Sequence, residues 1–240
     1  MPLLKLPAWF TITAHLIPWL MCFYFFTIAI TNPEQMGQYL VKDSDSDGAG
    51  LVENLTVLVL IPGIIAGFYG FWKYRNLMQP IWTSYWLLLW TIACFYFAGE
   101  EISWGQWFFQ WSTPESFAQI NDQNETNLHN ISSWFDQKPR TLVELWIFIA
   151  GVIMPMLSLF KQKASQVTWQ YWTHPLPTLF SAGLFFTITR FSGWMETPEL
   201  RDLFGSSEVR ELCVALFLSL FLISFPVRLN QLKKELKLTS

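Results

Sequence analysis

The segment LVENLTVLVLIPGIIAGFYGFW (Leu51–Trp72) is an almost uninterrupted run of apolar residues. A helix needs about 20 such residues to cross the hydrocarbon core of a bilayer. Similar runs recur along the chain, and we interpret six of them as transmembrane helices: Ala8–Ile30, Leu51–Trp72, Ile81–Gly99, Thr141–Phe160, Trp169–Phe191 and Glu211–Val227. The sequence therefore predicts an all-α, polytopic membrane protein in which residues 1–240 form a single transmembrane domain.

The composition agrees with a membrane location. Hydrophobic residues make up 52% of the 240 residues and charged residues only 14%, whereas soluble domains carry about 25% charged residues. Aromatic residues reach 18%, and such side chains are enriched where a membrane meets water. The expected partner is the lipid bilayer, and no nucleic-acid partner is expected.

The placement of charge predicts the orientation. Basic residues occupy the two termini and two short loops: Lys5, Lys73, Arg75, Lys161, Lys163, Arg228, Lys233, Lys234 and Lys237. With six spans, all of these segments lie on one side, and positive loops stay in the cytoplasm. Of the 18 acidic residues, only Glu235 lies on that side. We therefore expect both termini in the cytoplasm.

Each of the three outer segments begins with the same pattern, seen in Asn32-Pro33-Glu34, Thr113-Pro114-Glu115 and Thr197-Pro198-Glu199. A capping side chain, proline at the first helical position and then an acid are typical of a helix N-terminus. The pattern predicts short interfacial helices on the outer face. They either end the spans and turn the chain, or cover an outward-facing pocket.

Two adjacent carboxylates interrupt the apolar run FAGEEISWGQWFFQW (Phe97–Trp111). If the helix continues to Trp111, Glu100 shares a face with Ser103, whereas Glu101 faces about 100° away. The two carboxylates then reach one site only if the helix bends. Otherwise one of them serves a site and the other meets a neighbouring helix or the aqueous rim.

Further ionisable residues lie at the outer ends of the expected spans, where burial in hydrocarbon costs several kcal/mol unless the group is paired or hydrated. We predict an outward-opening polar pocket formed by these residues. Its catalytic candidates are Glu100, Glu101 and His129, and its substrate-binding candidates are Glu53, Ser103, Gln106, Asn127, Glu144 and Arg190.

Two kinds of chemistry suit this set, and the residues do not decide between them. Glu100, Glu101 and His129 could hold a divalent metal. Alternatively, a desolvated glutamate beside His129 could exchange protons with a lipid headgroup. A purely structural interpretation also stands, in which Arg190 pairs with one glutamate while the others cap helices or face water.

Other cofactor chemistry is not favoured. His15 and His174 lie at similar expected depths, as a bis-histidine haem needs, but helix packing or a polar contact explains them as well. Cys22, Cys94 and Cys213 lie one per span without disulfide or metal-ligand spacing. The chain has no His-Glu-x-x-His and no Gly-x-Ser-x-Gly motif.

Four segments resemble a pattern found in other proteins: Gly50–Glu53, Gly99–Gln106, Thr113–Glu115 and Asn127–Asn130. Together they are similar to a pattern in uncharacterised bacterial multi-pass inner-membrane proteins. The resemblance implies a bacterial inner membrane and no particular mechanism. It also implies that four members of the predicted pocket occur together as a set, namely Glu53, Glu100, Glu101 and His129.

The leading hypothesis is a membrane-embedded enzyme or binding protein for a lipid-linked substrate. Glu100 or Glu101 would be the acid–base group or metal ligand, His129 its partner, and Arg190 the anchor for an anion. One alternative is a structural or accessory subunit of a larger membrane complex. Another is an ion-coupled transporter that uses the buried carboxylates.

Overall fold

Helices dominate the computed structural model, which describes residues 6–40, 50–120, 126–128, 133–158 and 169–238. The all-α prediction is confirmed, since the described residues contain no strand. The longer helices are α1 (Ala8–Thr31), α2 (Pro33–Leu40), α3 (Leu51–Tyr74), α4 (Trp82–Glu101), α7 (Ser133–Trp146), α10 (Phe180–Ser192) and α11 (Ser207–Leu238). The shorter ones are η1 (Arg75–Leu77), η2 (Ser103–Gly105), α5 (Gln106–Phe109), α6 (Glu115–Ala118), η3 (Ile147–Ile153), α8 (Met154–Ser158), α9 (Trp169–Thr173), η4 (Pro177–Leu179) and η5 (Glu199–Phe204).

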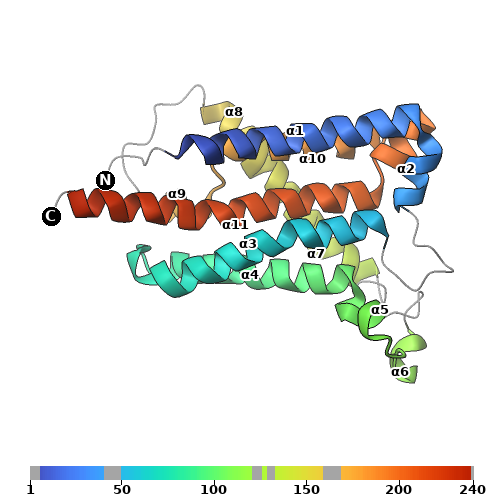
Figure 1. Ribbon diagram of the computed structural model, residues 1–240, viewed down its shortest axis with the longest axis horizontal. Coiled ribbons are helices and arrows are strands. Elements are labelled where there is room, and N and C mark those ends of the chain that lie inside the picture. The colour runs from blue at the N-terminus through green and yellow to red at the C-terminus, as the bar shows by residue number, and fades with distance from the viewer. Residues whose placement is uncertain (1–5, 41–49, 121–125, 129–132, 159–168, 239–240) are drawn as a thin grey trace.

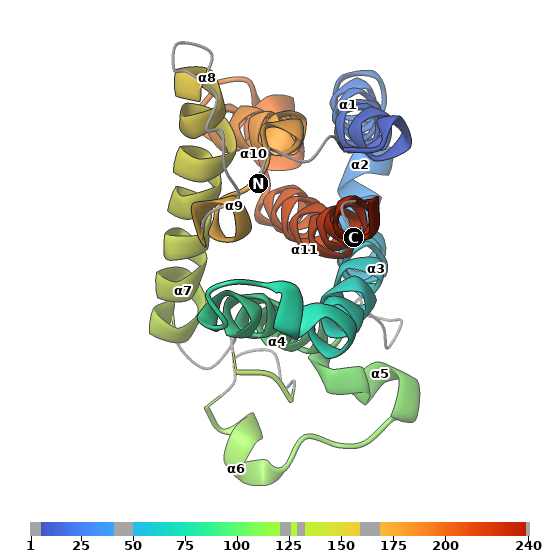
Figure 2. The ribbon, with the colours of Figure 1, turned by 90° about the vertical axis from the view of Figure 1, so that its left-hand side faces the viewer.

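Helix α11 lies at the centre of the bundle, with the other long helices around it (Figure 2). In its most apolar window 94% of the residues are buried, against 28–33% in the other three candidate spans. A helix that is apolar on every side is stable only when it is surrounded. The outer helices instead expose large apolar side chains, as helices that face lipid do.

Small residues allow α3 to approach its neighbours closely. A Cβ atom at Gly63 would lie 2.6 Å from the Ser219 Cα in α11, and one at Gly67 would lie 2.1 Å from the Thr91 Oγ1 in α4. Glycines four residues apart form one stripe on a helix. This stripe lets α3 pack against both α11 and α4, so it fixes where the ends of these helices meet.

Four helical segments are long and apolar enough to cross a membrane: Ala8–Thr31, Leu51–Leu77, Lys138–Ser158 and Ser207–Leu236. The third is continuous through α7, η3 and α8, with a π-helical segment just before Pro155. Helix α4 is also long, but its many Trp and Tyr residues lower its mean hydropathy. These four segments indicate a membrane protein.

The expected fifth span, Trp169–Phe191, is not one continuous helix. It is divided into α9 and α10 with η4 between them. The reason is the sequence His174-Pro175-Leu176-Pro177, because proline lacks a donor N–H and pushes the preceding residue out of the α region. Arg228 of α11, which is fully buried, donates a hydrogen bond to the Tyr171 carbonyl oxygen in α9.

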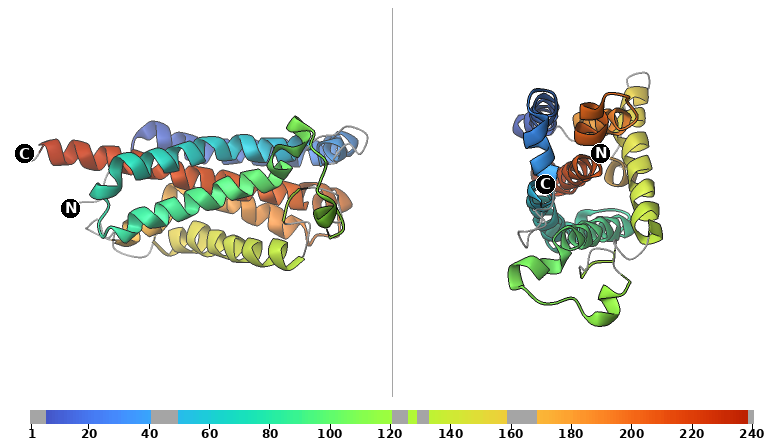
Figure 3. Two further views of the ribbon diagram at one scale, coloured as in Figure 1. Left: turned by 90° about the horizontal axis from the view of Figure 1, so that it is seen from below. Right: turned by 90° about the vertical axis from the view of Figure 1, so that its right-hand side faces the viewer.

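Acidic residues are concentrated at one end of the bundle, whereas basic residues lie at both ends. The start of α1, the η1 turn and the end of α11 lie together at one end, with Lys73, Arg75, Lys233 and Lys234 (Figure 1). At the opposite end, α2, α5, α6 and η5 follow the ends of longer helices, and the α5–α6 segment projects away from the bundle (Figure 3). The acidic ends of α3, α4 and α11 also lie here.

Candidate functional site

The acidic stretch that ends α4 turns sharply instead of continuing as a helix to Trp111. Helix α4 ends at Glu101, and Ser103, Trp104 and Gly105 have φ values of 46°, 57° and 92°. These left-handed conformations break the helix and redirect the chain. Glu100 and Glu101 thus remain neighbours on a regular helical turn, with side chains about 100° apart.

Glu100 turns toward the segment that follows the helix. It is buried, with 4% of its surface exposed. Its Oε1 accepts a hydrogen bond from the Trp104 indole N–H at 2.7 Å, and its Oε2 accepts one from the Leu128 backbone N–H at 2.7 Å. In this structure Glu100 therefore holds two loop segments together.

Three substrate-binding candidates belong to the same loop packing. The Asn127 side-chain amide donates to the Ser103 Oγ at 3.2 Å. The Gln106 side-chain Oε1 accepts from the Thr126 backbone N–H at 2.7 Å. These side chains belong to the loop segments that Glu100 joins, and none of them lines the cavity next to Glu101 that is described below. His129 lies outside the described residues.

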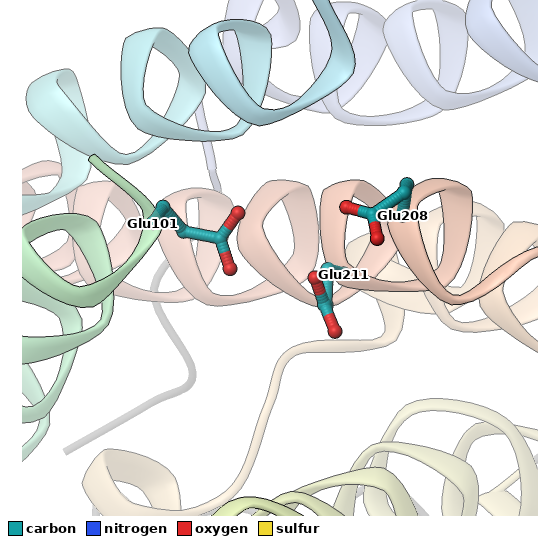
Figure 4. A group of neighbouring side chains, drawn as sticks. All are labelled: Glu101, Glu208 and Glu211. Carbon is teal, nitrogen blue, oxygen red and sulfur yellow. The ribbon is translucent and has the colours of Figure 1, made fainter. Parts of the chain in front are cut away.

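Glu101 turns the other way, toward α11. Its carboxyl group points at Glu208 and Glu211, which lie one turn apart on α11 (Figure 4). One oxygen from each of the three carboxylates can be chosen so that all lie within 4.8 Å of one another. All three residues are partly buried. Such a group is favourable only if its negative charge is offset by cations or protons.

Two arginines extend this group across α7 to α10. Arg140 of α7 forms an ion pair with Glu211, and its Nε lies 3.2 Å from the Oε1 of Glu144 one turn along the helix. The other oxygen of Glu144 lies 3.7 Å from the Nε of Arg190 in α10. Glu144 is therefore shared by two guanidinium groups.

Glu53 has a local structural role at the start of α3. Its Oε2 accepts a hydrogen bond from the Gly50 backbone N–H at 2.9 Å, which is a capping contact at a helix N-terminus. Glu53 is also close enough to Glu101 for its charge to act on that carboxyl group. It therefore belongs to the electrostatic surroundings of the acidic group, while its own carboxylate caps α3.

A cavity of about 240 Å³ lies beside Glu101, between α4, α7 and α11. We call it the acid cavity. Its polar lining residues are Glu101, Arg140 and Glu211, and these lie at one end of the helices that form it. Its apolar lining residues are Trp90, Ala93, Tyr96, Phe97, Pro139, Val143, Val214 and Leu218. From Glu101 to Trp90, helix α4 extends roughly 16 Å at 1.5 Å per residue.

The surroundings of Glu101, which follows the expected span Ile81–Gly99, favour its protonated form. Burial raises the pKa of the Glu101 carboxyl well above its ordinary value, and the charges of Glu211, Glu208 and Glu53 raise it further. Arg140 lowers it and does not compensate. The raised pKa favours a proton on Glu101, as a general acid or a hydrogen-bond donor requires.

A second cavity, of about 270 Å³, lies on the other side of α7, against α10. It contains Glu144 and Arg190 and shares no lining residue with the acid cavity. Of the predicted site residues, the structure thus brings Glu101 and Glu53 near each other. It places Glu144 and Arg190 in a separate cavity. The remaining described ones lie in the loop packing: Glu100, Ser103, Gln106 and Asn127.

The sequence analysis overlooked Arg140. It lies just before the expected fourth span and one turn before Glu144, a spacing typical of helical ion pairs. That spacing could have pointed to it. Glu208 and Glu211 lie at the start of the expected sixth span, and they were likewise not predicted to belong to the site.

The two histidines considered for haem have local polar contacts. The Nδ1 of His15 in α1 lies 2.7 Å from the Ser181 Oγ in α10. The Nδ1 of His174 lies 3.0 Å from the Gln170 carbonyl oxygen. Both contacts are of the kind that helix packing requires.

The fold and the site together define a helical protein with four candidate membrane spans and an acid-lined cavity at one end of its bundle. No protein-family model, no curated protein and no solved structure matches this chain. The geometry of the site is therefore the basis for any functional conclusion.

Proposed function

We propose that this protein crosses the bacterial inner membrane six times, with both termini in the cytoplasm and the acid cavity toward the periplasm. Helix α4 and the divided α9–α10 segment would supply the two spans beyond the four apolar ones. From Trp82 to Gly99, α4 extends roughly 27 Å at 1.5 Å per residue, close to the thickness of the hydrocarbon core. The end that holds both chain termini carries Lys73, Arg75, Lys233 and Lys234, and Glu235 is its one acid among the described residues, which supports this orientation.

Within that topology, the protein is a membrane-embedded enzyme or binding protein for a lipid-linked substrate. The observation that carries this proposal is the acid cavity, whose lining is charged at one end and apolar over the rest of its length. An amphipathic molecule has the same division. Its polar group would lie at the charged end, and its chain would lie along the aromatic side chains of α4.

Each charged residue then has a distinct role. Glu101, which favours its protonated form, would exchange a proton with the polar group of the substrate. Arg140 replaces Arg190 as the expected anion anchor, because it lines the same cavity as Glu101. Glu211 orients Arg140 through their ion pair.

A divalent cation is an alternative way to offset the negative charge. Glu101, Glu208 and Glu211 are acidic oxygen ligands of the kind that Mg²⁺, Ca²⁺ and Mn²⁺ prefer, and their oxygens are close enough to share one ion. A cation there would also attract the phosphate of a lipid-linked substrate. The sequence hypothesis placed the metal at Glu100, Glu101 and His129, but Glu100 turns away from this group.

Ion-coupled transport is a second candidate function, favoured by one observation. The α9–α10 segment is divided by unwound backbone, as in transporters whose discontinuous helices form ion or substrate sites. Flux that depends on a proton or sodium gradient in proteoliposomes would support it. Its absence under both gradients would exclude it.

The main proposal is tested by mass spectrometry of the lipids and metals that remain bound to the purified protein. Wild type, Glu101→Ala and Glu196→Ala are compared, because Glu196 is an exposed acid outside the acid cavity. We expect wild type and Glu196→Ala to retain a bound lipid. Glu101→Ala should retain on the order of tenfold less, because a hydrogen bond to the charged polar group of the lipid is lost. Equal lipid content in all three proteins would exclude a role for Glu101 in substrate binding.

A further inference from the structure

The second cavity, which we call the α7–α10 pocket, has the character of a lipid site of its own. Its lining residues are Thr141, Glu144, Leu145, Phe148, Phe186, Thr187, Arg190, Phe191 and Trp194. Arg190 and Glu144 lie toward the acidic end of the bundle. Phe186 and Phe148 lie one turn further from that end, because α10 runs toward it and α7 runs away from it.

The positive charge of Arg190 is only partly compensated. Its Nε lies 3.7 Å from a Glu144 oxygen, beyond ordinary hydrogen-bond distance. Glu144 is at the same time in closer contact with Arg140, at 3.2 Å. Within the described part of the chain, the guanidinium of Arg190 has this one ion-pair contact, and 40% of its side chain remains exposed.

The aromatic surroundings of Arg190 are typical of a membrane–water boundary. Its guanidinium carbon lies 5.2 Å from the centre of the Trp194 ring, and 66% of Trp194 and 54% of Phe191 are exposed. Tryptophan is enriched where lipid headgroups lie. Arginine is the side chain best suited to bind a phosphate through two N–H groups at once.

We propose that the α7–α10 pocket binds a membrane phospholipid, with its phosphodiester at Arg190 and an acyl chain against Phe148 and Phe186. The alcohol esterified to the phosphate should be uncharged, as the glycerol of phosphatidylglycerol is. A positively charged headgroup amine would need a carboxylate, and Glu144, the one carboxylate among the described lining residues, is already shared by two arginines. The inference rests on the membrane location proposed above, but not on the chemistry of the acid cavity.

The test uses native mass spectrometry of the full-length protein released from nanodiscs that contain phosphatidylglycerol and phosphatidylethanolamine in equal amounts. We expect wild type to retain phosphatidylglycerol preferentially and Arg190→Gln to retain on the order of tenfold less, because a charge-assisted hydrogen bond is lost. The matched control is Arg201→Gln, since Arg201 is an exposed arginine paired with its neighbour Asp202. Its retention should equal that of wild type.

A second variant separates lipid binding from folding. Leu145 lines the pocket from α7 and is 52% exposed, so Leu145→Trp should fill the pocket without disturbing the core, and it should lower phosphatidylglycerol retention while Arg190 is intact. Arg190→Gln should leave the lipid bound in the acid cavity unchanged, because Arg190 lines the α7–α10 pocket and not the acid cavity, and this distinguishes the two sites. Retention in Arg190→Gln equal to wild type would overturn the proposal. Displacement of the lipid by millimolar inorganic phosphate would show a site for free phosphate instead.

Discussion

At the scale of single residues, Glu100 and Glu101 have opposite environments although they are adjacent. Glu100 accepts two short hydrogen bonds from loop groups, which stabilise its carboxylate. Glu101 meets three other carboxylates and one arginine, which favour its protonated form. The rotation of about 100° per helical residue is sufficient to separate them.

The raised pKa of Glu101 predicts how stability depends on pH. The folded protein holds a proton on Glu101 that the unfolded chain releases at the ordinary pKa of glutamate, so this stabilisation is complete at low pH and is lost as the pH rises through the folded-state pKa. In EDTA, wild type should lose thermal stability as the pH rises from the ordinary pKa of glutamate, about 4.3, toward the raised folded-state pKa, and Glu101→Gln should lose less. Thermal unfolding in detergent measures both.

The matched control is Glu196→Gln, which removes an exposed carboxylate outside the acid cavity and should follow the wild-type pH dependence. If the stability of wild type and that of Glu101→Gln change in parallel with pH, folding does not raise the pKa of Glu101. The proposed proton exchange would then have to be assigned to another group.

Sequence reasoning predicted Glu101 as a site residue, but it did not predict Arg140, Glu208 or Glu211. The clustering of acids at one end follows from their positions at span ends, and it places Glu101 and Glu53 near each other. The sequence could not show that Glu144 and Arg190 line a cavity separate from that of Glu101. The two cavities lie on different sides of α7. The direction of a side chain depends on how each helix is rotated against its neighbours.

At the scale of helices, close packing of α3 explains why the acidic ends of α3, α4 and α11 meet. Gly63 and Gly67 allow contact with α11 and α4, and the capping contact of Glu53 defines where α3 begins. The division between α9 and α10 is caused by proline residues, whose effect on the backbone is not measured by hydropathy. Two prolines interrupt an apolar run that is long enough to span a membrane.

Gly63→Ala should destabilise the protein by about 1–3 kcal/mol, because the added methyl group forces α3 and α11 apart. The nearest atom is the Ser219 Cα, which belongs to the backbone and cannot rotate away. Gly37→Ala is the control, since a Cβ there has no neighbour within 4 Å. Chemical unfolding in detergent compares the two, and equal stability of Gly63→Ala and wild type would contradict the packing described here.

At the scale of the whole molecule, one central helix organises the bundle. Helix α11 is buried on all sides, so the remaining helices are held by a common partner as well as by one another. The same helix carries Glu208 and Glu211 at one end and Arg228 toward the other. A tilt of α11 would therefore alter the acid cavity and the α9 contact together.

The proposed topology is tested by cysteine labelling, because the three native cysteines are buried and should not react. Asn76→Cys and Gln119→Cys are exposed positions at opposite ends of the bundle. A membrane-impermeant maleimide applied to intact cells with a permeable outer membrane should label Gln119→Cys but not Asn76→Cys. Asn76→Cys should react once the inner membrane is opened. Labelling of both positions in intact cells would contradict the topology.

The chain's apolar runs, proline positions and charge distribution are enough to predict helices, their approximate limits and the end at which the acids gather. These properties are local. A helix forms its hydrogen bonds within its own backbone, and an apolar run avoids water whichever helices it packs against. The grouping of Glu101 with Glu208, Glu211 and Arg140, and the separation of two cavities by α7, arise only on folding. They depend on contacts between residues far apart in the chain, and packing selects those contacts.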